Sequence, residues 1–229
     1  METHGERNVV FDAAIRCHPS SQPRDGKKVN GKQFILITAI TSIVVVVLYF
    51  WADMPIMVFF QSHKHDSYNE FFKVVTNLGR AVYYLVPAGG LFLFFRTKNP
   101  LRAKKAAFLF VAVAVSGLIT DGIKLIMCRA RPKLLFDDHI YGFEFFHWDH
   151  EYFSFPSGHS TTALSAATVF ALLFPKYRWL FLLGGVCVAV SRMAVVAHFP
   201  SDVVAGSVVG ICTSLILYDK LFKVELHRA

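Results

Sequence analysis

The stretch AAFLFVAVAVSGLITDGIKLIMC, residues 106–128, decides the class of fold. It is apolar along almost its whole length, and a helix of about 20 such residues is long enough to cross the hydrocarbon core of a bilayer. Its two charged residues, Asp121 and Lys124, lie toward its carboxyl end. Ionisable groups inside a membrane span are costly and usually functional. The stretch therefore predicts a transmembrane helix that leads into a functional site.

Five further apolar runs accompany this one. They cover residues 34–52, 71–95, 157–174, 179–197 and 201–218. Asn77, Gly79 and Arg80 interrupt the second run, so its membrane part is expected to begin near Ala81. Each run is judged against the roughly 20 residues that a span requires. The sequence thus predicts an all-α fold, a six-transmembrane-helix bundle over residues 34–219 with an outer capping loop.

The segments outside the predicted bundle are polar. Residues 1–33 mix Pro and Gly with charges, which predicts a flexible cytoplasmic tail. Residues 220–229 are expected to form a short cytoplasmic C-terminus. The first apolar run begins only at Phe34, whereas the apolar part of a cleaved secretory signal lies nearer the start of a chain. We therefore expect this run to be a retained membrane anchor.

The composition favours a membrane protein over other classes. Hydrophobic residues make up 54% of the chain and charged residues 17%, against roughly 45–50% and 25% in soluble domains. The net charge of +8 does not indicate nucleic-acid binding, because the basic residues flank apolar runs and form no stripe with interleaved aromatics. The four cysteines include no CxxC pair, so we expect neither a disulfide framework nor a zinc site.

The charges of the loops predict an orientation. The connections 96–105 and 175–178 carry Lys and Arg without any acidic residue, whereas the loop 133–155 is rich in Asp and Glu. Because cytoplasmic loops carry the excess of Lys and Arg, both termini are expected in the cytoplasm and the acidic loop outside. The end of the third run, the start of the fourth and the junction of the last two then meet at the outer face.

Polar residues occur at each of these three outer positions. Lys124 and Arg131 are seven residues apart, which is two helical turns, so both side chains can point the same way. Pro132 is expected to end the helix there. Asp121 is a candidate partner for Lys124. Alternatively, Arg131 is only an interface anchor whose side chain snorkels to the membrane surface.

The second position carries Pro156-Ser157-Gly158-His159, directly before an apolar helix. Backbone N–H groups at a helix start favour an anion, and Gly158 lets that backbone approach closely. The Ser157 hydroxyl can donate to a phosphate oxygen, and His159 is placed to give a proton to a leaving oxygen. The alternative is an ordinary helix cap beside an interfacial histidine.

The third position carries Ser191-Arg192, His198 and Asp202. A nucleophilic histidine needs one ring nitrogen free and the other held by an acceptor, and Asp202 follows His198 by about one helical turn. Arg192 adds a planar fork suited to two phosphoryl oxygens. In the alternative interpretation, Arg192 and Asp202 are a buried charge pair and His198 is interfacial.

In order, the three groups read Lys-x6-Arg-Pro, Pro-Ser-Gly-His and Ser-Arg-x5-His-x3-Asp over residues 124–202. This pattern resembles the signature of the phosphatidic acid phosphatase type 2 superfamily at every motif position. The six apolar runs extend the resemblance to about 34–219 and leave the tail uncovered. That superfamily also includes soluble acid phosphatases and vanadium haloperoxidases, and the predicted spans favour its membrane lipid phosphatase branch.

The resemblance implies a division of roles. His198 would attack phosphorus and form a phosphohistidine, Asp202 would orient it, and His159 would protonate the leaving group and then activate water. The implied phosphate-binding residues are Lys124, Arg131, Ser157, Gly158 and Arg192. Because fixed cations neutralise the phosphate, we expect neither a metal ion nor a cofactor. No GxxxxGK[ST] loop is present in the sequence, which argues against nucleotide-driven chemistry.

The expected function is hydrolysis of a phosphomonoester or diphosphate on a membrane lipid. Candidate substrates are lipid A, undecaprenyl diphosphate, phosphatidylglycerol phosphate and phosphatidic acid. The expected location is a bacterial inner membrane with the active site facing the periplasm. The expected partners are the lipid substrate and the bilayer, not nucleic acid, and the oligomeric state is open. Two alternatives use the same residues: phosphoryl transfer to a second lipid, and lipid binding or transport without phosphate release.

The outer loops hold further polar and aromatic residues. Five histidines there have no standard metal-ligand spacing, so a metal site is the weaker interpretation. They are His63, His65, His139, His147 and His150. The stretch YGFEFFHW, residues 141–148, is either a flap that guides lipid to the site or an aromatic belt at the membrane interface.

Overall fold

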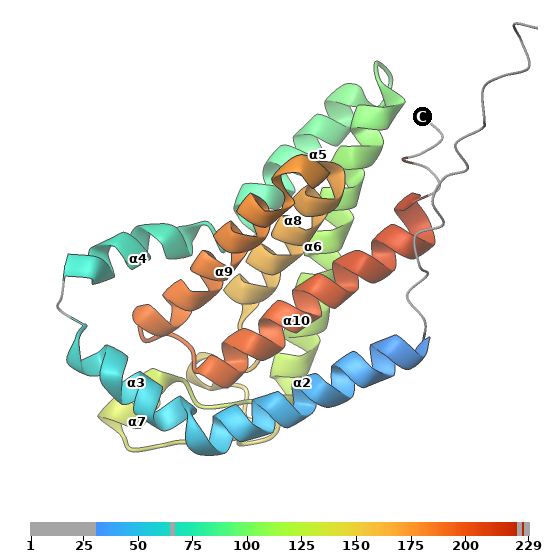
Figure 1. Ribbon diagram of the computed structural model, residues 1–229. Coiled ribbons are helices and arrows are strands. Elements are labelled where there is room, and N and C mark those ends of the chain that lie inside the picture. The colour runs from blue at the N-terminus through green and yellow to red at the C-terminus, as the bar shows by residue number, and fades with distance from the viewer. Residues whose placement is uncertain (1–30, 65–66, 224–225, 227–229) are drawn as a thin grey trace, which may run out of the picture.

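The computed structural model describes residues 31–64, 67–223 and 226, and its regular elements are helices (Figure 1). The only β structure in these residues is a pair of isolated bridges from Arg129 to Phe143 and Phe153. The predicted all-α class is confirmed. The predicted flexible tail lies outside the described residues except for 31–33, which form the start of the first helix. His65 and most of the C-terminus beyond 223 also lie outside them.

The helices follow one another with short connections. They are α2 (Gly31–Trp51), α3 (Asp53–Ser62), α4 (Ser67–Asn77), α5 (Val82–Phe95), α6 (Pro100–Met127), α7 (Pro132–Asp137), α8 (Gly158–Leu173), α9 (Arg178–Ala194) and α10 (Pro200–Leu217). Two 3-10 turns, His150–Tyr152 and Pro175–Tyr177, precede α8 and α9, and a π-helical turn, Tyr218–Phe222, extends α10.

Five helical segments of the described chain are long and apolar enough to cross a membrane. They are Phe34–Trp51, Asn69–Phe95, Pro100–Met127, Pro175–Ala194 and Pro200–Phe222. The predicted fourth span is a helix, α8, but it has only 16 residues. At 1.5 Å per residue it measures roughly 24 Å, which is shorter than a hydrocarbon core of about 30 Å. The count of six spans is therefore not confirmed.

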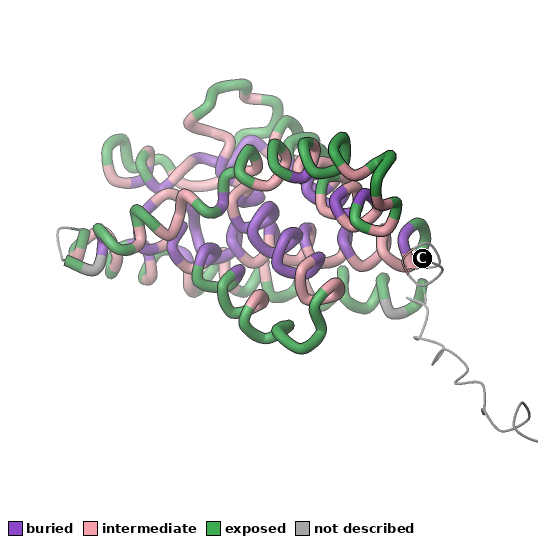
Figure 2. The backbone as a smooth tube through the Cα atoms, turned by 90° about the horizontal axis from the view of Figure 1, so that it is seen from above, coloured by how far each residue is buried: buried purple, intermediate pink, exposed green. Residues whose placement is uncertain are grey.

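Helix α8 forms the core of the bundle. All its residues from Ser160 to Val169 are buried, and it packs against α6, α9 and α10. Figure 2 shows that the buried residues gather in the interior of the bundle. Gly206 of α10 lies so close to the start of α8 that a Cβ atom there would overlap the carbonyl oxygen of Ser157. Small residues allow such close helix contacts in membrane proteins. The contact fixes the start of α8 against the first turns of α10.

The second apolar run is divided into two helices. Helix α4 ends at Asn77 and α5 begins at Val82, close to Ala81, where the sequence predicts the membrane part of this run to begin. Gly79 and Arg80 occupy the break between them. The break lies at the end of the bundle that carries the candidate site.

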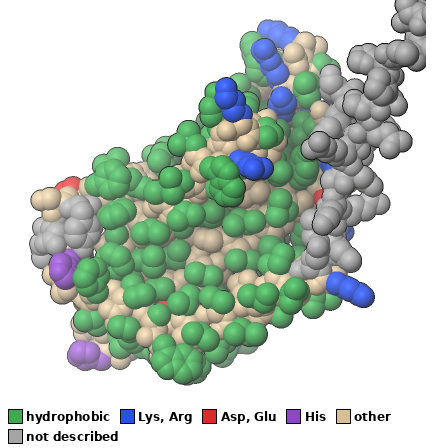
Figure 3. Space-filling view, viewed as in Figure 1, with side chains coloured by type: hydrophobic (Ala, Val, Ile, Leu, Met, Phe, Trp, Pro, Cys, Tyr) green, Lys and Arg blue, Asp and Glu red, His purple; other side chains and the backbone are tan. Residues whose placement is uncertain are grey.

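The two ends of the bundle differ in charge, and its sides are apolar. Hydrophobic side chains cover the face seen in Figure 3, and Lys and Arg gather where α5 meets α6. On α2, Ile35, Phe50 and Trp51 are 68%, 69% and 71% exposed, as expected for side chains that face lipid. The loop with α7 lies at the opposite end, beside α3 (Figure 1). Its capping role stays a prediction.

Candidate active site

The three polar groups of the sequence meet at the end of the bundle where α6 ends and α8 and α10 begin. The backbone N–H of Ser157 donates to the carbonyl oxygen of Asp202 at 3.0 Å. A Cβ atom at Gly158 would lie 3.1 Å from Nζ of Lys124. His159 interacts electrostatically with Lys124, Arg192 and His198. Arg131, the residue before α7, interacts in the same way with Lys124 and Arg192. All eight predicted site residues therefore belong to one cluster.

His198 lies in the connection between α9 and α10 and is only 3% exposed. Its Nδ1 is 3.6 Å from Oδ2 of Asp202 and 3.4 Å from Oγ of Ser154. Burial lowers the pKa of His198 to about 4, because it disfavours the charged ring more than the neighbouring Asp202 favours it. The ring is consequently neutral at pH 7. With Nδ1 turned toward the carboxylate, Nε2 is the nitrogen available for attack on a substrate.

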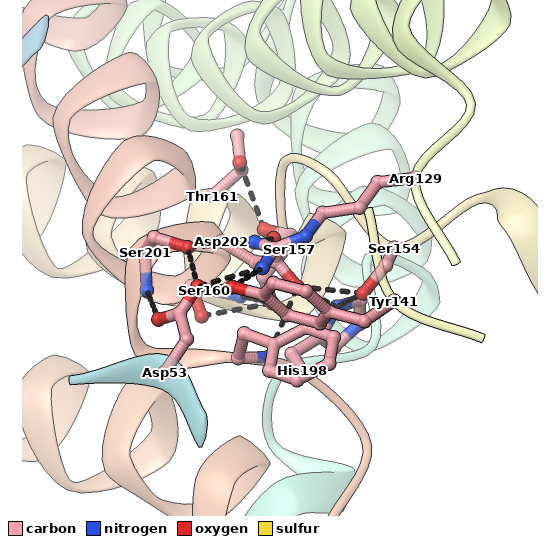
Figure 4. A network of polar contacts seen from close by, with 11 residues as sticks. Asp53, Arg129, Tyr141, Ser154, Ser157, Ser160, Thr161, His198, Ser201 and Asp202 are labelled. Atoms are coloured by element: carbon pink, nitrogen blue, oxygen red, sulfur yellow. Dashed lines mark hydrogen bonds and ion pairs between the residues drawn. The ribbon is translucent and has the colours of Figure 1, made fainter. Parts of the chain in front are cut away.

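The Asp202 carboxylate is held by several donors (Figure 4). Its Oδ2 accepts from Oγ of Ser154 at 2.6 Å and from the backbone N–H of Phe199 at 3.0 Å. Its Oδ1 accepts from Nη1 of Arg129 at 2.6 Å. The bond from Phe199 is part of the cap of α10, so the helix start and the carboxylate fix each other's position.

His159 lies in the first turn of α8 and packs against the break between α4 and α5. A Cβ atom at Gly79 would lie 2.7 Å from Cβ of His159 and 2.8 Å from its Cδ2. Only glycine therefore fits against this histidine. Arg80, the next residue, is exposed and interacts electrostatically with both His159 and Arg192. The break places a further cation at the site, one that the sequence analysis did not identify as a site residue.

Two arginines of the cluster have donors without partners. The Nε atoms of Arg131 and Arg192 are buried, and neither has a hydrogen-bond partner within the described chain. Nη1 of Arg192 donates to Oγ1 of Thr76 at 2.6 Å, which ties α9 to α4. A buried donor without an acceptor is costly. An anion such as a phosphoryl group would satisfy both donors.

Lys124 and Ser157 complete the anion-binding groups. The Lys124 side chain is 17% exposed, and its Nζ lies 3.6 Å from Oδ1 of the exposed Asp121, the partner that the sequence suggested. Oγ of Ser157 accepts from the backbone N–H of Ser160 at 3.4 Å and from its hydroxyl at 2.9 Å. Because both bonds use Ser157 as the acceptor, its own proton can still be donated. The N–H groups of Gly158 and His159 precede the first hydrogen bond within α8, from Thr161 to Ser157.

Several residues that contact the site were missed by the sequence analysis. The most buried are Asp53, Arg129 and Ser154. Arg129 stands two residues before the motif arginine, and Asp53 directly follows the first apolar run. A charge at the end of an apolar run is a weak signal of function. Nothing in the sequence indicates that these two residues contact each other.

The outer loops leave their alternatives open. The described part of the chain contains no group of three or more His, Cys, Asp or Glu side chains that could hold a metal ion. Phe145, Phe146 and Trp148 are 59%, 67% and 74% exposed. Nε1 of Trp148 donates to the carbonyl oxygen of Leu125 at 3.4 Å. This exposure suits both an interfacial belt and a flap.

Comparison with known proteins agrees with the motifs. A 42% identical segment of 110 residues is shared with a lipid A 1-phosphatase of Rhizobium johnstonii and covers 48% of this chain and 45% of that protein. A 30% identical segment of 130 residues is shared with an undecaprenyl-diphosphatase of Sulfolobus acidocaldarius and covers 56% and 59%. The chain spans about half the length of the relatives that it matches.

Two solved structures share the fold. The LpxE protein of Aquifex aeolicus superposes with a TM-score of 0.56 at 24% identity, over 72% of this chain and 93% of that one. A transmembrane phosphatidylglycerolphosphate phosphatase of Bacillus subtilis has the same TM-score at 19% identity, over 84% and 96%. The family model described as the PAP2 superfamily matches residues 105–225, more than half of the chain. The chain belongs to the PAP2 superfamily.

Proposed function

We propose that this protein is an integral membrane lipid phosphatase that hydrolyses a phosphomonoester or diphosphate of a membrane lipid through a phosphohistidine. One observation carries the proposal: the neutral, buried ring of His198 lies beside the Asp202 carboxylate, in the cluster that holds Arg131 and Arg192 with their unpartnered Nε donors. A nucleophile and an anion cradle in one place suit phosphoryl transfer.

In the first step Nε2 of His198 attacks phosphorus in line with the bond to the leaving oxygen. An N–P bond forms as the P–O bond breaks. Burial and the neighbouring cations keep His159 neutral in the free protein, so it takes up a proton when the negative phosphate lies beside it and gives that proton to the leaving lipid alcohol or lipid phosphate. The attacking ring becomes positively charged. The carboxylate of Asp202 stabilises that charge, as the buried aspartate of a catalytic triad stabilises an imidazolium.

In the second step His159, now neutral, takes a proton from water. The hydroxide attacks phosphorus, the N–P bond breaks, and inorganic phosphate leaves with His198 neutral again. Throughout, the equatorial oxygens are held by Lys124, Arg131 and Arg192, together with the hydroxyl of Ser157 and the N–H of Gly158. These groups are fixed charges and dipoles, so we propose that the reaction requires no metal ion.

The substrate is a phosphorylated lipid of a bacterial envelope. Lipid A, undecaprenyl diphosphate, phosphatidylglycerol phosphate and phosphatidic acid are the candidates, and the relatives that act on lipid A and undecaprenyl diphosphate favour the first two. The site lies at the end of the bundle away from the basic α5–α6 connection. From the positive-inside rule we propose that both termini lie in the cytoplasm of an inner-membrane protein and that the site faces the periplasm, with α8 as the sixth span.

The direct test is phosphate release by the full chain, purified in non-ionic detergent, from each of the four candidate lipids. His198→Asn is the inactive variant, and His150→Asn, an exposed outer-loop histidine, is the matched control. We expect release from at least one lipid by the wild type and the control, and none by His198→Asn. Phosphate transfer to an added lipid acceptor without release would favour the phosphotransferase alternative. Full activity of folded His198→Asn would overturn the proposal.

A further inference from the structure

A polar network that joins the motif residue Asp202 to residues outside the motifs centres on Arg129, whose side chain is fully buried (Figure 4). Nη1 of Arg129 donates to Oδ1 of Asp202 at 2.6 Å, and Nη2 donates to Oδ2 of Asp53 at 2.6 Å. All three side chains have zero exposure. Two carboxylates thus share one guanidinium in the interior, and the group carries a net charge of −1.

We infer that Arg129 and Asp53 are positioning residues that set the orientation and the charge of the His198–Asp202 pair. The inference rests on the proposed function, in which His198 is the nucleophile. Asp53 lies at the start of α3, outside the segment 105–225 that matches the family. The N-terminal part of the chain therefore contributes to the site through Arg129.

Aromatic rings hold the guanidinium in place. The Cζ atom of Arg129 is 4.2 Å from the ring centre of Phe199 and 5.0, 5.4 and 5.3 Å from those of Tyr49, Tyr141 and Phe143. Such cation–π contacts favour the charged group, the more so when water is excluded. Tyr141 accepts from Nη2 of Arg129 at 3.2 Å and donates to the carbonyl oxygen of Tyr49 at 2.7 Å. The fork of Arg129 has one orientation, and it fixes which way each carboxylate turns.

The network holds the carboxylate that serves the nucleophile. Arg129 binds Oδ1 of Asp202, so Oδ2 is the oxygen that faces Nδ1 of His198. A contact that only fastened α3 to α10 would not need this arginine. Ser201 already provides that link, because its N–H donates to Oδ1 of Asp53 at 2.9 Å and its hydroxyl donates to Oδ2. The arginine adds a connection to Asp202, next to the nucleophile.

The net charge of the network predicts in which direction each substitution shifts the titration midpoint of His198. Burial raises the pKa of Asp53, and the nearby Arg129 opposes the rise. Arg129→Met leaves two carboxylates without their cation and makes the network more negative, which favours a proton on His198. Asp53→Asn makes it neutral and has the opposite effect. Asp53→Asn with Arg129→Met, or Arg129→Lys alone, restores the native net charge.

The other charged groups around His198 stay the same in all these variants. They are Lys124 from α6, Arg131 before α7, His159 from α8 and Arg192 from α9. A shift in the titration of His198 therefore reports the network alone. The matched control is Lys133→Met, which removes the cation of an exposed ion pair with Glu151 in the same loop.

The experiment uses the full chain in detergent micelles with 13C-labelled histidine. The His198 signal is assigned from its loss in His198→Asn and is followed from about pH 3 to pH 8, and kcat and KM are measured alongside for the hydrolysed lipid. We expect the titration midpoint of His198 to rise by roughly 1 pH unit in Arg129→Met. It should return to the wild-type value when Asp53→Asn is combined with Arg129→Met. It should stay at the native value in Arg129→Lys and in Lys133→Met. Asp53→Asn should lower the titration midpoint of His198. It should also lower kcat and leave KM unchanged.

A His198 titration that does not move in folded Arg129→Met, or one that the second substitution does not restore, would overturn the inference. If Arg129→Met does not fold, Asp53→Asn carries the test alone, and an unmoved titration there would overturn it. The titration needs no turnover. If the expected shifts occur in a protein that releases no phosphate from any lipid, the network stands and the proposed function falls.

Discussion

The contact between Gly79 and His159 allows a sharp test of the proposed general acid. In Gly79→Ala the added Cβ would meet Cβ of His159 at 2.7 Å, where ordinary contacts begin at 3.4 Å, so the histidine must move by about 0.7 Å. Misplacing a catalytic group by about 1 Å can cost roughly 100-fold in rate. We therefore expect kcat to fall by about 100-fold, equivalent to about 2.7 kcal/mol of transition-state stabilisation.

The assay compares two leaving groups. A lipid phosphate with an alkyl leaving group needs the proton from His159, whereas an aryl phosphate leaves without it. In the first turnover Gly79→Ala should release the alkyl alcohol far more slowly than the wild type and the aryl alcohol at nearly the wild-type rate, because only the second step needs His159 for both esters. The matched control is Gly90→Ala in α5, where nothing lies within 4 Å of the added atom, and it should behave as the wild type. Equal losses in first-turnover release from both esters, or no loss, would refute the role of His159 as the general acid.

Three further outcomes are expected. Burial lowers the pKa of His198 from 6.5 to about 4, so the unfolded chain binds a proton more readily than the folded one. The contribution of His198 to the free energy of unfolding should therefore be complete above about pH 6.5 and fall by up to about 3 kcal/mol as the pH drops to 4. Thermal melts against pH should show a shallower slope in His198→Asn than in the wild type, and the buried His159 supplies the slope that remains in the variant. Gly206→Ala should destabilise the fold by roughly 1–3 kcal/mol, because the new Cβ overlaps the carbonyl oxygen of Ser157. Gly184→Ala, with open space around the added atom, should not destabilise it. Equal melting temperatures of the two variants would contradict this close packing of α8 and α10. Phosphate release should persist in excess EDTA, and a loss that a divalent ion restores would disprove the metal-free reaction.

Hydropathy and loop charge were enough to predict that the motif residues would meet. The helical spacing expected for Lys124 and Arg131 was wrong, because α6 ends at Met127 and Pro132 begins α7 instead of ending a helix. Lys124, Ser157 and Asp202 each stand at an end of an apolar run, and runs that cross the same bilayer bring their ends to one of two faces. The charge difference between the connection 96–105 and the loop 133–155 then selects the common face. The catalytic roles came from the resemblance, and they stay proposals.

The predicted count of six spans depends on the apolar run at 157–174, and a buried core helix and a membrane span are both apolar. Helix α8 has 16 residues, and several of its buried residues are Ser and Thr. Those hydroxyls pair with neighbouring helices, as Ser165 does with Ser214 at 2.9 Å. Ser and Thr side chains form such bonds between helices in membrane proteins too.

The supporting contacts of the site could not be predicted from the sequence. Arg129 and Asp53 are 76 residues apart, and an ion pair between distant segments has no periodic pattern. The same holds for Gly79 and His159, where the signal is the absence of a side chain at one position. These contacts depend on how the helices pack, and packing is set by the shapes of many side chains together.

The central claim, that His198 is the nucleophile, is tested most directly by trapping the covalent intermediate. The full chain is mixed with a lipid carrying a 32P-labelled phosphate and quenched with alkali within milliseconds, since phosphohistidine survives alkali and decomposes in acid. We expect alkali-stable label on the peptide that contains His198, and none in His198→Asn. Label on a different residue, or turnover at the wild-type rate by His198→Asn, would contradict the account.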